Sequence, residues 1–285
     1  MTDSPGAVKK ILLALESGKR EPFNLDVTVD FALRFKAEVT GLFVEDTDLL
    51  RLSALPFSTQ VNLTTALSHP LERGDLERDF AVMAAAARRR LSDAAARREV
   101  KWSFKTVRGR AMTEIVAAAA DADLLVMEGG RPGARRYESL GMSPGAALAH
   151  VSQSLLILRA DRPFTRAVAV VYDGRPLSRK ALSAAAAFMQ PEDKLTVLLC
   201  AGRDKNERVL TEEARAILGL AAGVASFEPA NLLSIPSLCL QMRLRDPGLI
   251  VMGADNPLLA NGPVLPDGDV HGLLDTLECP LWVVP

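Results

Sequence analysis

Short runs of consecutive apolar residues alternate along the chain with longer segments whose apolar residues recur every three or four positions. Lys9–Glu16 (KKILLALE) and Arg166–Asp173 (RAVAVVYD) are runs of the first kind, and each ends in an acidic residue followed by a turn. Near-continuous apolar strands that alternate with helical segments are typical of a parallel sheet covered on both faces. Strands are predicted near 9–16, 38–44, 102–108, 123–127, 154–158, 166–172, 194–199, 223–228, 248–252 and 281–284.

This order of elements occurs twice. Met127, in the fourth strand of the first half, lies 28 positions before Leu155 in the fifth. Met252 lies 29 positions before Leu281 in the second half. The sequence therefore predicts an α/β protein of two tandem open-sheet domains, each a five-stranded parallel sheet with helices on both faces, in a Rossmann-like arrangement.

The predicted domains span 1–160 and 161–285, and the polar linker between them is short. A short linker favours halves that pack against each other. Because an apolar final strand at a sheet edge leaves amides and carbonyls unpaired, we expect strands 154–158 and 281–284 to pair antiparallel within the chain, as an intramolecular pseudo-dimer. Pairing between two chains, in a homodimer, is the alternative. The residues expected at the centre of the contact are Leu156, Leu158, Leu281 and Val283.

The first helix of each half has its own apolar positions. They are Val29, Ala32, Leu33 and Phe35 in one half, and Leu177, Ala181, Ala184, Ala185 and Phe188 in the other. The first half also has an extra segment, 46–70, with apolar residues Leu49, Leu50, Leu52, Leu55, Phe57 and Val61. We expect this insertion to fold over an apolar patch, closing a pocket or contacting a partner subunit. An amphipathic helix is predicted over 72–99, with a stripe of Leu76, Phe80, Met83, Ala87 and Leu91.

Composition narrows the classes of function. The net charge of −1 and an aromatic content of 5% argue against nucleic acid as a partner. No apolar run approaches the ~18–20 residues that a membrane helix needs, so no membrane interaction is expected. Cys200, Cys239 and Cys279 are far apart and form no CxxC motif, which favours buried thiols in a cytoplasmic protein over a disulfide framework.

Several local motifs together resemble the universal stress protein family. They are Val170–Gly174 (VVYDG) in the second half, and Val107–Arg110 (VRGR) and Asp121–Met127 (DADLLVM) in the first, each set followed by a glycine-bearing loop, a short helix and an apolar final strand. The resemblance covers nearly the whole chain, twice. It implies a five-stranded parallel sheet in each half. Some members bind ATP or AMP through a loop of the form GxxG, nine residues, then glycine and Ser or Thr, while the acidic residue after the first strand holds the adenosine end.

The first half keeps part of that loop. Gly130 and Gly133 fit GxxG, but only seven residues separate Gly133 from Gly141, and Met142 stands where Ser or Thr is expected, with Ser143 one place later. Glycines allow a close approach of backbone amides to phosphate. The resemblance therefore implies an eroded site for ATP or AMP.

Other residues of the candidate site come from elsewhere in the first half. Arg131, with Arg135 and Arg136, would attract an anion, whereas Glu128 would repel it. Glu16 stands in for the family's aspartate, and Val44 lies at the end of the second strand, where the family packs the nucleotide. A solvated glycine-rich loop with no ligand is the alternative interpretation.

The second half has lost more of the motif. Asn256 replaces the second glycine of GxxG, and the loop contains Asp255, Asp267 and Asp269 without a basic residue. We expect no nucleotide there. The carboxylates are interpreted as solvated groups, with Asp269 a helix cap, rather than as a cation site.

No set of catalytic residues is recognisable, and no metal site is expected: His69, His150 and His271 have no partner at triad or metal-ligand spacing. Arg88, Arg89, Arg90, Arg97 and Arg98 are interpreted as the solvated face of a helix. Three hypotheses follow. The chain is a non-enzymatic stress-response or regulatory protein that binds an unidentified protein or small molecule, a nucleotide-responsive switch or slow ATPase, or a carrier of a small apolar ligand held by the insertion.

Overall fold

The computed structural model describes residues 8–16, 25–55, 59–61, 68–70, 72–129, 142–159, 165–201, 206–230, 234–260, 273 and 276–285. Its main sheet consists of β1 Lys10–Glu16, β2 Glu38–Asp46, β5 Trp102–Gly109, β6 Leu124–Glu128, β7 Ser154–Leu158, β8 Ala167–Tyr172, β9 Lys194–Leu199, β10 Ala225–Pro229, β11 Leu249–Gly253 and β12 Leu281–Val284. The helices are α1 Leu25–Phe35, α2 Thr47–Ser53, α3 Arg73–Arg97, α4 Ala111–Ala119, α5 Pro144–His150, α6 Pro176–Phe188, α7 Glu207–Leu218, α8 Ile235–Arg245 and α9 Pro257–Ala260. A 3-10 helix, η1 Gly219–Gly223, and a small hairpin of β3 Thr59–Val61 with β4 Ser68–Pro70 complete the described elements.

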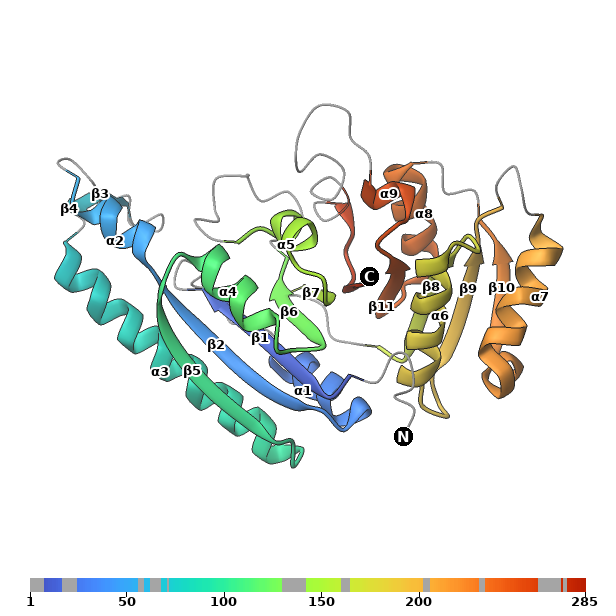
Figure 1. Cartoon of the computed structure of the whole chain (residues 1–285), viewed down its shortest axis with the longest axis horizontal. Helices are drawn as coiled ribbons and strands as arrows, with labels where there is room; N and C mark the ends of the chain where they lie inside the picture. Colours follow the sequence, from blue (N-terminus) through green and yellow to red (C-terminus); the bar gives the residue numbers. More distant parts are fainter. Residues whose placement is uncertain are drawn as a thin grey trace.

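One sheet of ten strands runs through both halves, in the order β10-β9-β8-β11-β12-β7-β6-β1-β2-β5 (Figure 1). Each half, counted by its own strands, has the order 3-2-1-4-5, and all pairs within a half are parallel. The order reverses between β1 and β6 in the first half and between β8 and β11 in the second. In open α/β sheets, ligands bind at the carboxyl ends of the strands beside such a switch point.

Helices cover both faces of the sheet, because the strands are apolar on both sides. Along β1, Ile11 and Leu13 face a core formed with α1, α3, α6 and α7. The intervening Leu12 faces a second core formed with α4, α5, α8 and α9. This alternation of period two within an almost wholly apolar strand is what a doubly covered parallel sheet requires.

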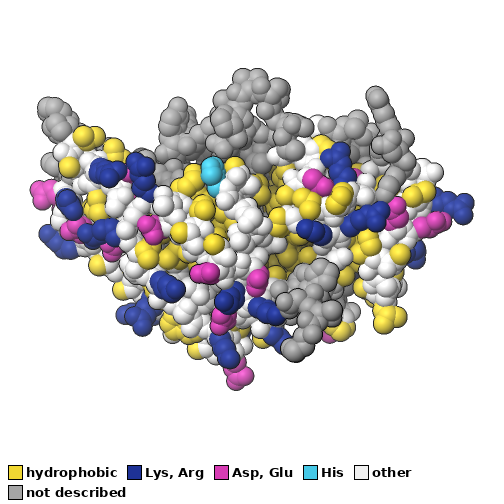
Figure 2. Space-filling model, viewed as in Figure 1, with side chains coloured by type: hydrophobic (Ala, Val, Ile, Leu, Met, Phe, Trp, Pro, Cys, Tyr) yellow, Lys and Arg dark blue, Asp and Glu magenta, His cyan; other side chains and the backbone are white. Residues whose placement is uncertain are grey.

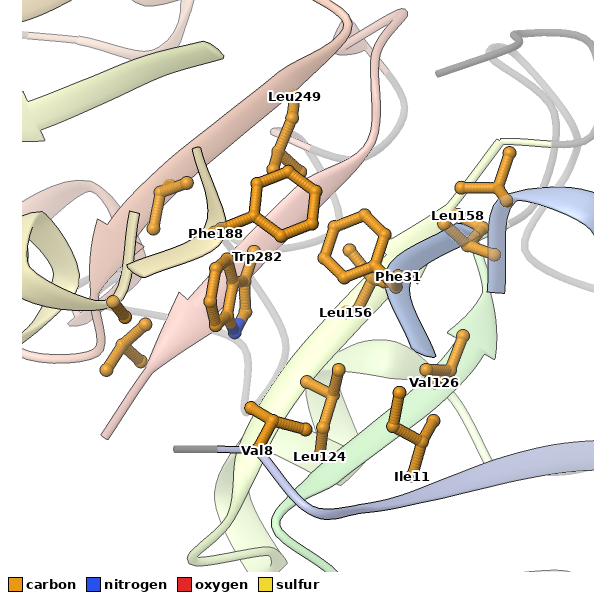
Figure 3. Packing of buried hydrophobic residues seen from close by; sticks show 14 of the residues in the cluster. Val8, Ile11, Phe31, Leu124, Val126, Leu156, Leu158, Phe188, Leu249 and Trp282 are labelled. Atoms are coloured by element: carbon orange, nitrogen blue, oxygen red, sulfur yellow. The ribbon is translucent and has the colours of Figure 1, made fainter. Parts of the chain in front are cut away.

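The halves join through β7 and β12, which pair antiparallel as expected. Trp282 lies opposite Leu156, with Leu281 opposite Ile157 and Val283 opposite Leu155. The indole of Trp282 packs edge-on against Phe31 of α1 and Phe188 of α6 at centroid distances of 6.0 Å each (Figure 3). The joint is therefore an aromatic core that both halves supply.

The predicted apolar positions of the first helix need one correction. Leu33 is half exposed, and Phe31 is buried in its place, since the helix presents residues 31, 32 and 35 to the core.

The insertion begins after Asp46, because β2 continues alongside β5 as far as the Asp46–Gly109 pair. Leu50 of α2 is buried, whereas Leu52 and Leu55 face solvent. The predicted side-chain roles of Phe57 and Val61 lie outside the described residues.

The other helical predictions agree with the structure. The amphipathic helix predicted over 72–99 is α3, which buries Phe80 and Leu91. The region of the second half corresponding to this helix is the shorter α7. Within the described residues, no helix is both long and apolar enough to cross a membrane.

Candidate functional site

The switch point of the first half brings three predicted elements of the site together. Glu16, the last residue of β1, pairs in register with Val44 of β2. Continuing the β1–β6 register places Gly129 level with Glu16 on the other side. Val44 is fully buried. The backbone thus places the acidic residue, the end of the second strand and the start of the glycine loop at one edge.

Ser143 caps the next helix. Its hydroxyl accepts a hydrogen bond from the Ala146 amide at 3.1 Å, in the position of an N-cap residue of α5. Gly130, Arg131, Gly133 and Gly141 lie outside the described residues. The sequence prediction for these four residues therefore stays a prediction.

Sequence reasoning missed Arg159, which lies at the same edge. This residue directly follows β7 and is only 3% exposed. Its Nη1 lies 3.6 Å from the position that a Cβ would occupy on Gly129, so its guanidinium passes beside the base of the glycine loop. A buried cation here is suited to an anion or to an internal carboxylate. No motif marks it, because its place depends on the pairing of β7 with strands far away in sequence.

The switch point of the second half is closed by its own side chains. Asp173, the counterpart of Glu16, accepts a hydrogen bond from the Arg175 amide at 3.0 Å, and its other oxygen lies 3.5 Å from Arg175 Nε. Asp255 Oδ2 accepts the Leu177 amide at 3.4 Å, in the first turn of α6. The positive end of that helix, where an anion would be stabilised, thus already holds a carboxylate.

Two neighbours of Asp255 tighten this closure. A Cβ on Gly253 would lie 2.6 Å from the Leu177 carbonyl carbon, so only glycine allows β11 to end this close to α6. Asn256 is 4% exposed, and its Oδ1 accepts the Leu258 amide at 3.0 Å at the start of α9. The residue that replaces the second glycine of the motif is therefore a buried cap. Asp267 and Asp269 lie outside the described residues.

A polar network continues along the same edge toward α7. The Tyr172 hydroxyl donates to Glu213 at 3.3 Å, and Arg179 Nη2 donates to the same carboxylate oxygen at 2.8 Å. Burial, followed by the negative charge of Glu213, raises the pKa of Tyr172 to about 12. Burial also raises the pKa of the Cys200 thiol to about 12, with a smaller effect from Asp173. Neither group is suited to act as a nucleophile or base near neutral pH.

The remaining candidate groups have structural roles where they are described. His150 is exposed, and its Nδ1 lies 2.9 Å from the Ala146 carbonyl oxygen in its own helix. No group of three or more His, Cys, Asp or Glu in the described ranges could hold a metal ion. His69 is described only in its backbone, and His271 lies outside those ranges.

The arginines at the end of α3 are paired with α1. Arg98 Nε lies 2.5 Å from an oxygen of Asp30, and Arg97 Nη2 lies 3.0 Å from an oxygen of Asp26. On the face of the molecule in Figure 2, Lys and Arg side chains alternate with Asp and Glu rather than gathering in one basic area. These pairs support the interpretation of a solvated, charge-balanced helix face.

The strand order 3-2-1-4-5 defines a class of open α/β sheets, in which bound ligands lie at the switch point. Within that class, this chain is similar to the crystal structure of a universal stress protein from Archaeoglobus fulgidus DSM 4304, with a TM-score of 0.65 and 15% identity over 96% of this chain and 95% of that one. A functionally unknown protein from Pseudomonas aeruginosa PAO1 is similar with a TM-score of 0.60 and 14% identity, over 98% of this chain and 93% of that one. No protein-family model matches the chain, and no curated protein matches it significantly. The fold is therefore of the universal stress protein type, and the function has to be argued from the residues.

Proposed function

We propose that the chain is a tandem universal stress protein that acts by binding rather than by catalysis, and that any nucleotide binding is confined to its first half. The fold and the repeated strand order support the family assignment. Action by binding is the sequence hypothesis for this chain, in which no set of catalytic residues is recognisable. The proposed binding role is that of the first sequence hypothesis, a regulatory stress-response protein.

The observation that carries the asymmetry is the contact of Asp255 with the Leu177 amide. A phosphate bound at this end of α6 would lie beside the Asp255 carboxylate. That carboxylate already accepts the hydrogen bond from the Leu177 amide that the phosphate would need. At ~4 Å, two unit charges repel by about 4 kcal/mol when the effective dielectric constant is near 20. The second half is therefore unsuited to ATP or AMP.

One observation favours a nucleotide-responsive switch as the second candidate. The buried guanidinium of Arg159 lies beside Gly129, at the edge where Glu16 and Val44 pair. A cation in this place would attract a phosphate and so offset the repulsion between that phosphate and the Glu128 carboxylate. In this form of the proposal, the first half binds ATP or AMP and the second half transmits the bound state.

Native mass spectrometry of the purified full chain separates the candidates. A bound adenine nucleotide supports the switch, a bound lipid-like molecule supports a carrier that uses the 46–70 insertion, and a ligand-free mass supports a protein-binding regulator. Phosphate release from ATP is measured in parallel. Turnover above that of buffer alone, which is lost in a Glu16→Ala variant, would overturn the proposal that the chain is not an enzyme.

A further inference from the structure

Two of the three cysteines of the chain line one small cavity. The cavity is about 70 Å³ and lies between α8 and the residues that precede β12. Cys239 of α8 is 5% exposed, and Cys279 is 7% exposed. The other lining residues are Met242, Arg243, Asp246, Pro247, Thr276, Leu277 and Glu278.

The charged groups that act on Cys239 include the chain neighbour of Cys279. Burial raises the pKa of the Cys239 thiol, Arg243 and Arg159 oppose that rise, and Glu278 adds to it. Glu278 is the chain neighbour of Cys279. Continuing the register of β7 and β12, in which Ile157 lies opposite Leu281, places Arg159 level with Cys279. Glu278, next to Cys279 in the chain, and Arg159 thus both act on the Cys239 thiol.

The cavity is open to small molecules on one side. Arg243 and Glu278 form an ion pair of 3.3 Å across its lining, and their side chains are 61% and 42% exposed. A water molecule needs only ~10–15 Å³ of such space, so a hydroperoxide fits. Exposed ion pairs of this kind are weak, at ~0–1 kcal/mol, and open readily.

We propose that Cys239 and Cys279 are a dithiol–disulfide pair that a hydroperoxide oxidises. One of the two thiols loses its proton and attacks the peroxide as the thiolate, the O–O bond breaks, and a sulfenic acid and an alcohol or water result. The other thiol then attacks that sulfur, forms the S–S bond and releases water, so that one peroxide consumes two thiols. The bond ties α8 to the segment just before β12, the strand that joins the halves.

The test uses the full-length reduced chain and hydrogen peroxide in slight excess. Intact mass, thiol titration after unfolding and peptide mapping are measured on the product. We expect a loss of two hydrogen atoms, a fall from three thiols to one, a linked pair of peptides containing Cys239 and Cys279, and reversal by dithiothreitol.

Matched variants decide between this pair and general oxidation. Cys200→Ser should still form the bond, whereas Cys239→Ser and Cys279→Ser should form no intramolecular disulfide. Peroxide treatment in urea should give a mixture of pairings, because the folded cavity sets the pairing. Oxygen added to single thiols in the native chain, links between chains, or a bond that includes Cys200 would each overturn the proposal.

Discussion

Arg34 of α1 and Asp193, in the turn before β9, form a buried ion pair that links the two halves of the chain. One guanidinium nitrogen contacts Asp193 Oδ2, and Arg34 Nη2 lies 3.3 Å from Oδ1. The Asp193 side chain is 1% exposed, and its Oδ2 also accepts the Gln190 amide at 2.9 Å. The guanidinium lies over the ring of Phe188, 4.6 Å from its centroid. This fork fixes the orientation of α1 against α6 next to the Trp282 core.

Replacing Arg34 with leucine should strongly destabilise the chain. The Asp193 carboxylate would remain buried without its counter-charge, and loss of one partner of such a pair costs about 3–5 kcal/mol. Urea unfolding followed by circular dichroism measures the change. Arg97→Leu, which removes an exposed pair with Asp26, is the matched control and should cost less than ~1 kcal/mol. Equal losses in the two variants would show that the Arg34–Asp193 pair does not contribute to stability beyond a surface contact.

A lysine at position 156 should separate the halves. Leu156 is fully buried opposite Trp282, so a charged side chain there would have to leave the core or break the β7–β12 pair. Leu156→Lys with Val283→Lys should expose Trp282 and shift its fluorescence to the red. Leu33→Lys, at a position that is 51% exposed, is the control. Unchanged emission and stability in the double variant would contradict a joint through these strands.

Much of the fold could be predicted from the sequence because each strand is a short apolar run between turn residues. The strand predicted at 154–158 matches β7, and that at 123–127 is one residue from β6. The misses involve contacts between distant elements. Trp282 was not predicted as the centre of the joint, since its partners Phe31, Phe35 and Phe188 come from two helices that only the fold brings together.

Removing the Asp255 side chain should destabilise the second half slightly. Its carboxylate accepts the Leu177 amide in the first turn of α6, and loss of a group in this role costs ~0.5–2 kcal/mol. Thermal unfolding of Asp255→Ala measures the effect. Asp121→Ala, at an exposed position before β6, should leave the midpoint unchanged. A variant as stable as the parent chain would mean that Asp255 does not contribute to the end of α6.

Tyr172 makes the stability of the chain sensitive to alkaline pH. Burial and Glu213 raise its pKa from 10.0 to about 12 in the folded state, so the folded chain keeps a proton that the unfolded chain loses. The resulting stability is complete below pH 10 and is lost as the pH rises toward 12. Phenolate absorbance of the parent chain and of Tyr172→Phe isolates this titration. Ionisation of Tyr172 at an ordinary pKa in the folded chain would contradict the buried contact with Glu213.

The candidate site was less predictable than the fold. Glu16 and Val44 could be placed together because both end neighbouring parallel strands. The positions of the Arg159 and Asp255 side chains could not be predicted. Arg159 lies beside Gly129 only in the folded chain, and Asp255 contacts a helix 78 positions earlier in the chain. The sequence shows which positions depart from the family motif. Which side chains then occupy the site is determined by packing in the fold.

The most direct measurement is calorimetric titration of ATP into the full chain and into the variants Glu16→Ala and Asp173→Ala, which alter corresponding residues of the two halves. Asp173 already contacts the Arg175 amide and side chain, whereas Glu16 lies at the edge with the predicted glycine loop. We expect at most one ATP per chain, binding that is lost in Glu16→Ala, and no change in Asp173→Ala. Two ATP molecules per chain, or binding that survives Glu16→Ala and is lost in Asp173→Ala, would contradict it.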